Sequence, residues 1–254
     1  MERDTGTEND GDKVRRATVS RRGWLKILWT TVAVTGATWV ASVGQTRVVD
    51  ASQERSAKAS RKLISHLTFS GVPYRYAVQR VAQSLGLSVL LDRRLDPDSP
   101  VELVIDQPTE GVAIFRQFAG LRDAVAMEWG DLIFLTPSET VATISSARKA
   151  MSTELKRAKS RVRAALLRKR RVHWEDYAQP RRLIARWCGE EPDSGGEPER
   201  LEAFPHDLIA AAELPLMTLA DRITLMAVQY GMVAGIAKNG ERVTLRATNG
   251  SDFR

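Results

Sequence analysis

The sequence has very few of the side chains from which metal sites and catalytic centres are usually built. It contains one cysteine, Cys188, and three histidines, His66, His173 and His206. A single cysteine excludes an intramolecular disulfide and a thiolate-rich zinc or iron–sulfur site. No histidine has metal-ligand spacing to another, and the sequence has no G-x-S-x-G motif, phosphate-binding loop or dinucleotide fingerprint. We therefore expect no enzymatic activity, no cofactor and no bound metal, with Cys188 as a small core residue.

The overall composition is that of an ordinary folded protein with an excess of positive charge. Hydrophobic residues make up 43% of the chain and charged residues 27%, which argues against wholesale disorder. A length of 254 residues is enough for one or two small domains with their own cores. Lys and Arg number 38 against 31 Asp and Glu, which gives a net charge of +7.

A short basic motif stands immediately before an uncharged stretch, residues 27–46. The motif consists of Ser20, Arg21, Arg22, Gly23, Trp24, Leu25 and Lys26. A positive flank before an apolar stretch is typical of a segment that directs export or membrane insertion. The seven residues resemble the twin-arginine export motif, in which Phe usually stands at the position of Trp24. The resemblance implies a protein that is exported or anchored in the inner membrane, facing the periplasm.

The fate of this N-terminal segment stays open. Its uncharged residues would reach roughly 30 Å as a helix, which is enough to cross a bilayer as a permanent anchor. The best small-residue cleavage site lies before Ser52, although no A-x-A pattern precedes it. Both a released protein and an anchored one fit the sequence.

Residues 64–136 carry strand and helix patterns in the order β-α-β-β-α-β-β. A first helix is expected between Pro73 and Gly86, and a second is expected to start at Pro108. Apolar residues recur at helical spacing in the first helix. They are Tyr74, Ala77, Val78, Val81, Ala82 and Leu85. The strand patterns cover residues 67–69, 88–91, 101–105, 124–129 and 132–135.

These elements resemble, in order and spacing, the secretin and TonB short N-terminal domain. The resemblance is carried by Leu67-Thr68-Phe69-Ser70-Gly71-Val72-Pro73, Gly86-Leu87-Ser88-Val89-Leu90-Leu91-Asp92, Val101-Glu102-Leu103, Pro108 and Gly120-Leu121. The chain departs from the family pattern at Thr109 and Gly111. The resemblance implies an α+β fold and a module that binds a protein partner in the cell envelope. Strand addition at an exposed edge is the expected mode, with residues 132–135 as the candidate edge.

A strongly basic segment follows, and from Glu139 its pattern is helical. Residues 148–171 carry eleven basic residues against one acid, a local net charge of +10. The sequence leaves open a solvated spacer with its apolar residues on a neighbouring domain, an anion-binding helix, and nucleic-acid binding. Nucleic acid is disfavoured because no aromatic residue stands among the basic ones to stack on a base. The possible anion-binding residues are Arg161, Arg163, Arg168, Lys169, Arg170 and Arg171.

The last part of the chain repeats the earlier pattern in a weaker form. A strand is expected over residues 172–174, a helix from Pro180, and a second helix after Thr218. A hairpin around Asn239-Gly240 closes the pattern. This order predicts an internal duplication. A helical subdomain, or a segment that completes the first core, remains an alternative.

We therefore expect an α+β protein in five parts. They are an export signal or membrane anchor (1–51), a linker (52–62), a short N-terminal-like domain (63–137), a basic helical connector (138–171) and a second, degenerate unit of the same kind (172–254). The expected function is protein–protein interaction in the cell envelope. The alternative is binding of an anionic polymer or membrane surface through residues 148–171.

Replacement of Arg21 and Arg22 by Lys tests the export hypothesis. We expect the wild-type protein outside the cytoplasm or in the membrane, and the Lys-Lys variant retained inside, measured by cell fractionation. Intact mass then separates a released protein that starts near Ser52 from an anchored one. A full-length wild-type protein that is soluble in the cytoplasm would show that the export hypothesis is wrong.

Overall fold

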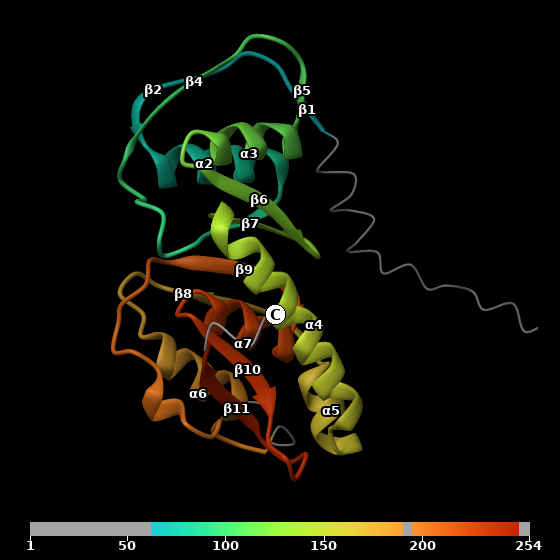
Figure 1. Cartoon of the computed structure of the whole chain (residues 1–254). Coiled ribbons are helices and arrows are strands. Elements are labelled where there is room, and N and C mark those ends of the chain that lie inside the picture. The colour runs from blue at the N-terminus through green and yellow to red at the C-terminus, as the bar shows by residue number, and fades with distance from the viewer. Residues whose placement is uncertain (1–61, 190–194, 249–254) are drawn as a thin grey trace, which may run out of the picture. The chain divides into compact units, whose positions relative to one another are not determined.

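The computed structural model describes residues 62–189 and 195–248, and these form an α+β fold (Figure 1). The first half contains β1 (Leu63–Ile64), β2 (Leu67–Pro73), α2 (Tyr74–Leu85), β3 (Ser88–Leu91), β4 (Pro100–Ile105), β5 (Thr109–Glu110), α3 (Gly111–Gly120), β6 (Ala124–Trp129) and β7 (Leu132–Pro137). The second half contains η1 (Ser138–Thr140), α4 (Val141–Arg157), α5 (Ser160–Leu166), β8 (Lys169–Trp174), α6 (Pro180–Gly189), η3 (Leu201–Ala203), β9 (Ala212–Thr218), α7 (Leu219–Val228), β10 (Met232–Ile236) and β11 (Val243–Ala247).

The predicted export segment, residues 1–51, lies outside the described residues, and so does the linker apart from Lys62. Within the described part of the chain, none of the helices combines the length and the apolar composition needed to cross a membrane.

Helix α2 begins and ends where the sequence predicts. Pro73, with φ −55°, precedes its first residue, and Gly86 ends it in the left-handed conformation with φ +70°. That conformation favours glycine because it has no Cβ. Every residue of the predicted apolar stripe is buried. The stripe packs into a first core together with α3, whose Phe115 and Phe118 are also fully buried.

Strand β7 is the central strand of a three-stranded sheet with the order β3-β7-β6. It pairs in parallel with β3, from Ser88 opposite Leu132 to Leu91 opposite Leu135, and antiparallel with β6. All six of its residues are buried. The prediction that residues 132–135 form an exposed edge is therefore wrong, because β3 returns from α2 and covers that edge.

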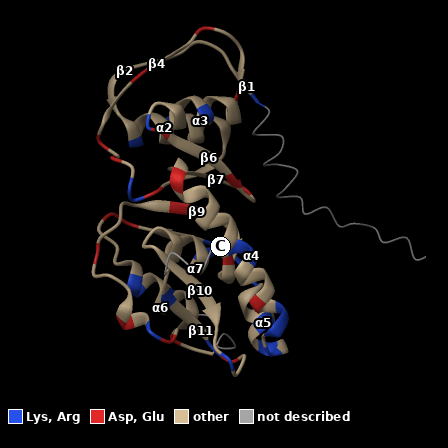
Figure 2. Ribbon diagram, viewed as in Figure 1, with Lys and Arg blue, Asp and Glu red and all other residues tan. Residues whose placement is uncertain are grey.

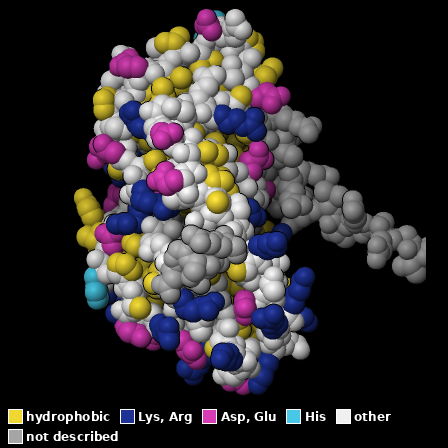
Figure 3. All heavy atoms as spheres, in the orientation of Figure 1, with side chains coloured by type: hydrophobic (Ala, Val, Ile, Leu, Met, Phe, Trp, Pro, Cys, Tyr) yellow, Lys and Arg dark blue, Asp and Glu magenta, His cyan; other side chains and the backbone are white. Residues whose placement is uncertain are grey.

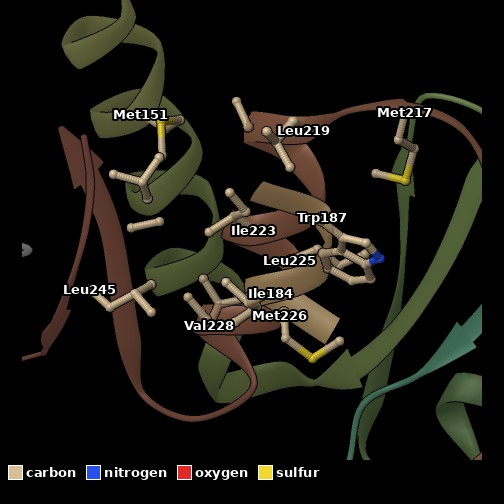
Figure 4. Close-up of a cluster of buried hydrophobic side chains, with 14 of the residues drawn as sticks. Met151, Ile184, Trp187, Met217, Leu219, Ile223, Leu225, Met226, Val228 and Leu245 are labelled. Carbon is tan, nitrogen blue, oxygen red and sulfur yellow. The ribbon is translucent and has the colours of Figure 1, made fainter. Parts of the chain in front are cut away.

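The two faces of β7 belong to two different hydrophobic cores. Ile133 and Leu135 face the first core, beneath α2 and α3, as expected for alternate residues of a strand. Leu132 and Phe134 face a second core. Side chains from α4, α6, α7 and β11 meet in that second core (Figure 4). Both halves of the described chain therefore depend on this strand.

Helix α3 starts three residues later than predicted, at Gly111 rather than Pro108. Residues Thr109–Glu110 instead form β5, which pairs antiparallel with β1. The backbone N–H of Gly111 donates to the carbonyl of Lys62 at 3.1 Å. Pairing with a distant segment thus delays the helix.

The basic connector is two helices and the start of a strand, not the single helix predicted. Helix α4 ends at Arg157, and the next residue, Ala158, is extended and buried. The N–H of Lys159 then donates to the carbonyl of Gly240 at 3.2 Å. Strand β8 begins at Lys169, so residues 169–171 are extended rather than helical.

The second half repeats the strand pairings of the first. Strands β8 and β9 are antiparallel with a register shift between Arg170 and Val172, as β2 and β4 are with a shift between Ser70 and Val72. Glu199 forms an isolated parallel bridge with β11. This bridge corresponds to the parallel pairing of β3 with β7 in the first half. The predicted closing hairpin is formed by β10 and β11, although its loop is longer than a two-residue turn.

Truncation of Phe134 tests whether the two cores unfold together. We expect Phe134→Ala to lower the free energy of unfolding by about 3–5 kcal/mol, because it opens a cavity beside a fully buried strand. Urea denaturation followed by far-UV circular dichroism and by tryptophan fluorescence should give one coincident transition. Val104→Ala is the control, because Val104 is 67% exposed on β4. Two separate transitions in the wild type would contradict the shared strand.

Candidate functional site

The cysteine and histidines do not form a metal site in the described chain. Residues 62–189 and 195–248 contain no group of three or more His, Cys, Asp or Glu side chains that could hold a metal ion. Cys188 lies on the buried face of α6, as predicted. Burial raises the pKa of its thiol to about 12, although nearby Arg222 acts in the opposite direction. A thiol in that state is a poor nucleophile.

The outer edge of β3 has no partner strand among the described residues. The N–H of Asp92 donates to the carbonyl of Leu135 on β7 at 2.8 Å. Since successive residues of a strand direct their backbone groups to opposite sides, Val89 and Leu91 direct theirs away from β7. The next outward donor along this edge, the N–H of Arg93, binds the side-chain oxygen of Gln229 at 3.3 Å.

A buried polar network fixes the end of β3. The carboxylate of Asp92 is 1% exposed and accepts a hydrogen bond from the hydroxyl of Thr136 at 2.7 Å. It also pairs with the guanidinium of Arg94 at 2.6 Å. This hydrogen-bonded pair raises the pKa of Arg94. Because Thr136 is on β7, the network holds the outer edge of β3 in a defined position.

Val89 and Leu91 line a cavity of about 190 Å³. Its opposite wall is formed by Trp174 and residues 208–212, from the second half of the chain. A second hollow shares Arg75, Gln79 and Ala211 with this cavity. We call the two hollows together the β3 groove.

The rim of the β3 groove carries exposed apolar side chains. Tyr76 is 52% exposed and Leu208 is 54% exposed, and each lines one of the two hollows. An amphipathic aromatic ring and an aliphatic side chain beside an apolar hollow are typical of surfaces that contact another protein.

The arginines around the β3 groove are already paired with carboxylates. Arg75 lies 3.9 Å from Asp98 and 3.7 Å from Asp176. Arg93 pairs with Asp207 at 2.9 Å and lies over the ring of Tyr230, 4.7 Å from its centroid. The groove therefore presents apolar surface and backbone groups rather than unpaired charge.

The predicted anion-binding residues are divided between two elements. Arg161 and Arg163 are exposed on α5, and Arg168 is exposed just after it. On β8, Lys169 and Arg171 are exposed, whereas Arg170 is half-buried on the opposite face. Figure 2 shows the cluster of basic residues on α5. The structure thus keeps these residues at the surface but not on one helical stripe.

Sequence reasoning missed the β3 groove because its walls are distant in sequence. Residues 89–93 and 208–212 are brought together only by the way the two halves pack. The predicted strand order gave a partial indication of this groove. A short strand that follows a helix in such a unit can pair on one side and leave its other side open.

No family model, no curated protein and no solved structure matches this chain. The assignment of function therefore depends on the geometry described above.

The buried thiol leads to a direct test. We expect Cys188 in the folded protein to react with Ellman's reagent far more slowly than a free thiol at pH 9, because a buried thiol with a pKa of about 12 is almost entirely protonated at that pH. An ordinary thiol with a pKa of about 8.5 is mostly ionised at pH 9 and reacts rapidly there. The protein in urea is the control and should react at once. Rapid stoichiometric reaction of the folded protein would contradict the burial.

Proposed function

We propose that the protein is a non-enzymatic cell-envelope module that recognises a protein partner. In this proposal both halves have the fold of the secretin and TonB short N-terminal domain. The support is the shared order of pairing: an antiparallel pair with a register shift, a helix, a segment parallel to the last strand, a second helix and a closing hairpin. Two units with one pairing order favour internal duplication.

The proposed location is outside the cytoplasm, either free or anchored in the inner membrane and facing the periplasm. The support is the motif at residues 20–26 and the uncharged stretch behind it.

The proposed mode of recognition is strand addition at the outer edge of β3. The observation that carries it is the pair of outward-facing backbone units at Val89 and Leu91, beside an apolar cavity. An extended peptide segment would pair with these units and place an apolar side chain in the cavity. Backbone hydrogen bonds would supply affinity, and the cavity would select the side chain.

The alternative function is binding of an anionic polymer or membrane surface through residues 148–171. It is favoured by the exposure of Arg161, Arg163 and Arg171. The two functions differ in their response to salt. Attraction between charges weakens steeply as salt is added, whereas pairing of backbone and apolar groups does not.

Proline on β3 tests strand addition. Val89→Pro removes an outward N–H while leaving the bonds to β7 in place, which an edge strand tolerates. A photo-crosslinking amino acid at exposed Gln79, in the β3 groove, should give a protein adduct in cells. We expect Val89→Pro to reduce that adduct about tenfold, with melting temperature as the measure of folding.

The matched control is a proline on the other open edge of the same sheet. Ser138 N–H donates to the carbonyl of Asp123 at 3.2 Å, so Ala126 on β6 directs its backbone groups away from β7. Ala126→Pro should therefore keep the adduct. A crosslinker at Val104, which is exposed on β4, should give no adduct. Equal adducts with both proline variants would show that the proposed mode is wrong.

A further inference from the structure

A second pocket, of about 760 Å³, lies between the end of α4, residues 199–200 and the β10–β11 hairpin. Among the residues that line it, four basic side chains come from four separate segments. They are Arg157 at the end of α4, Arg200 before η3, Lys238 in the hairpin loop and Arg246 on β11. The lining also holds two carboxylates, Glu154 and Glu199, so its net charge is positive.

Most of these basic groups have no carboxylate to neutralise them. Arg157 lies 3.7 Å from Glu154, but its side chain is 75% exposed, so the pair contributes little. Across the described chain, no carboxylate oxygen lies within 4.0 Å of Arg200, Lys238 or Arg246. This distinguishes the pocket from the β3 groove, whose arginines are paired. Like charges held together without a counter-charge favour binding of an anion.

The hairpin loop also carries a carboxylate, that of Glu241, which is engaged elsewhere. Glu241 does not line the pocket. It pairs with the ammonium of Lys159, and this pairing lowers the pKa of Glu241. It also accepts a hydrogen bond from the side-chain amide of Asn239 at 3.1 Å. The loop therefore keeps one acid away from the pocket while Lys238 contributes to its lining.

The frame of the pocket is fixed by backbone hydrogen bonds. Lys159 N–H donates to Gly240 at 3.2 Å, and Glu199 N–H donates to Val243 at 2.8 Å. Gly240 has φ +72°, and a Cβ there would lie only 3.3 Å from the backbone nitrogen of Lys159. Glycine at this position therefore permits the close approach of hairpin and helix. A fixed frame holds the basic groups in place before a ligand arrives, which lowers the cost of binding.

A glycine also accommodates one of the guanidinium groups. A Cβ on Gly235 would lie 3.5 Å from a terminal nitrogen of Arg246, so this side chain crosses over the bare backbone of β10. Arg246 thereby lies along the strand pair toward the hairpin loop, and it remains exposed. In Figure 3, Lys and Arg side chains also gather over α5, next to this end of α4, which would attract an anion from a distance.

We propose that this pocket binds a ligand bearing phosphate groups with two or more negative charges. Guanidinium groups match phosphate oxygens through paired hydrogen bonds, and a second negative charge is needed to balance the basic groups that have no partner. The ligand could be a soluble oligophosphate or the headgroup of an anionic lipid, which share this chemistry. The site goes beyond the proposed recognition of a protein at the β3 groove and does not depend on it.

Titration calorimetry of the full chain with pyrophosphate tests the site. We expect saturable binding, weakened about tenfold or more by the double change Arg200→Gln and Lys238→Gln. The matched control is Arg161→Gln with Arg163→Gln, which removes the same charge from α5 outside the pocket and should change the affinity less than about threefold. All four side chains are exposed, so both variants should keep the wild-type melting temperature.

Vesicles of phosphatidylcholine with and without cardiolipin, whose headgroup carries two phosphates, identify the source. Weaker flotation of the pocket variant than of the α5 variant with the anionic vesicles supports a lipid headgroup. Binding of pyrophosphate with equal flotation of both variants supports a soluble phosphate. Equal loss of pyrophosphate affinity in both variants would overturn the proposal, since the attraction would then come from the basic surface as a whole. Absence of pyrophosphate binding, together with equal flotation, would overturn it too.

Discussion

Burial of β7 on both faces is the constraint on which the rest of the structure depends. Its alternate residues pack into two cores, one beneath α2 and α3 and one shared with α4, α6 and α7. A strand buried on both sides cannot lose either layer without exposing apolar surface, at a cost of about 25 cal/mol for each Å². The two halves repeat one order of strand pairing, but they are therefore not independent domains.

This constraint also determines which backbone edges can meet a partner. With β7 in the centre, β3 and β6 are the edge strands of this sheet in the described part of the chain. The second half packs against one face of the sheet and brings residues 208–212 beside the open side of β3. Arg75 and Arg93 then join the two walls through carboxylates that follow β8 and precede β9. The β3 groove is thus a product of the way the halves pack.

Local patterns in the sequence predicted local structure, and they did not reveal pairings between distant segments. The stripe of α2 and the helix start after Thr218 depend on neighbouring residues, and each is confirmed. The place of β7 in its sheet, the late start of α3 and the break after Arg157 each depend on a contact with a distant segment. The β3 groove was missed for the same reason. The helical spacing of residues 148–171 does not reveal that the helix breaks where Lys159 bonds to the backbone of Gly240.

The basic connector shows how one segment can serve both the core and the surface. Its apolar residues Met151, Val162 and Leu166 are buried in the second core, as expected for a spacer that rests on its neighbour. Because α4 and α5 bury that face, their basic residues are directed outward. The break at Ala158 then brings the end of α4 against the β10–β11 hairpin, where Arg157 meets basic residues from three other segments. Core packing, rather than the number of basic residues, therefore decides where positive charge converges into a pocket.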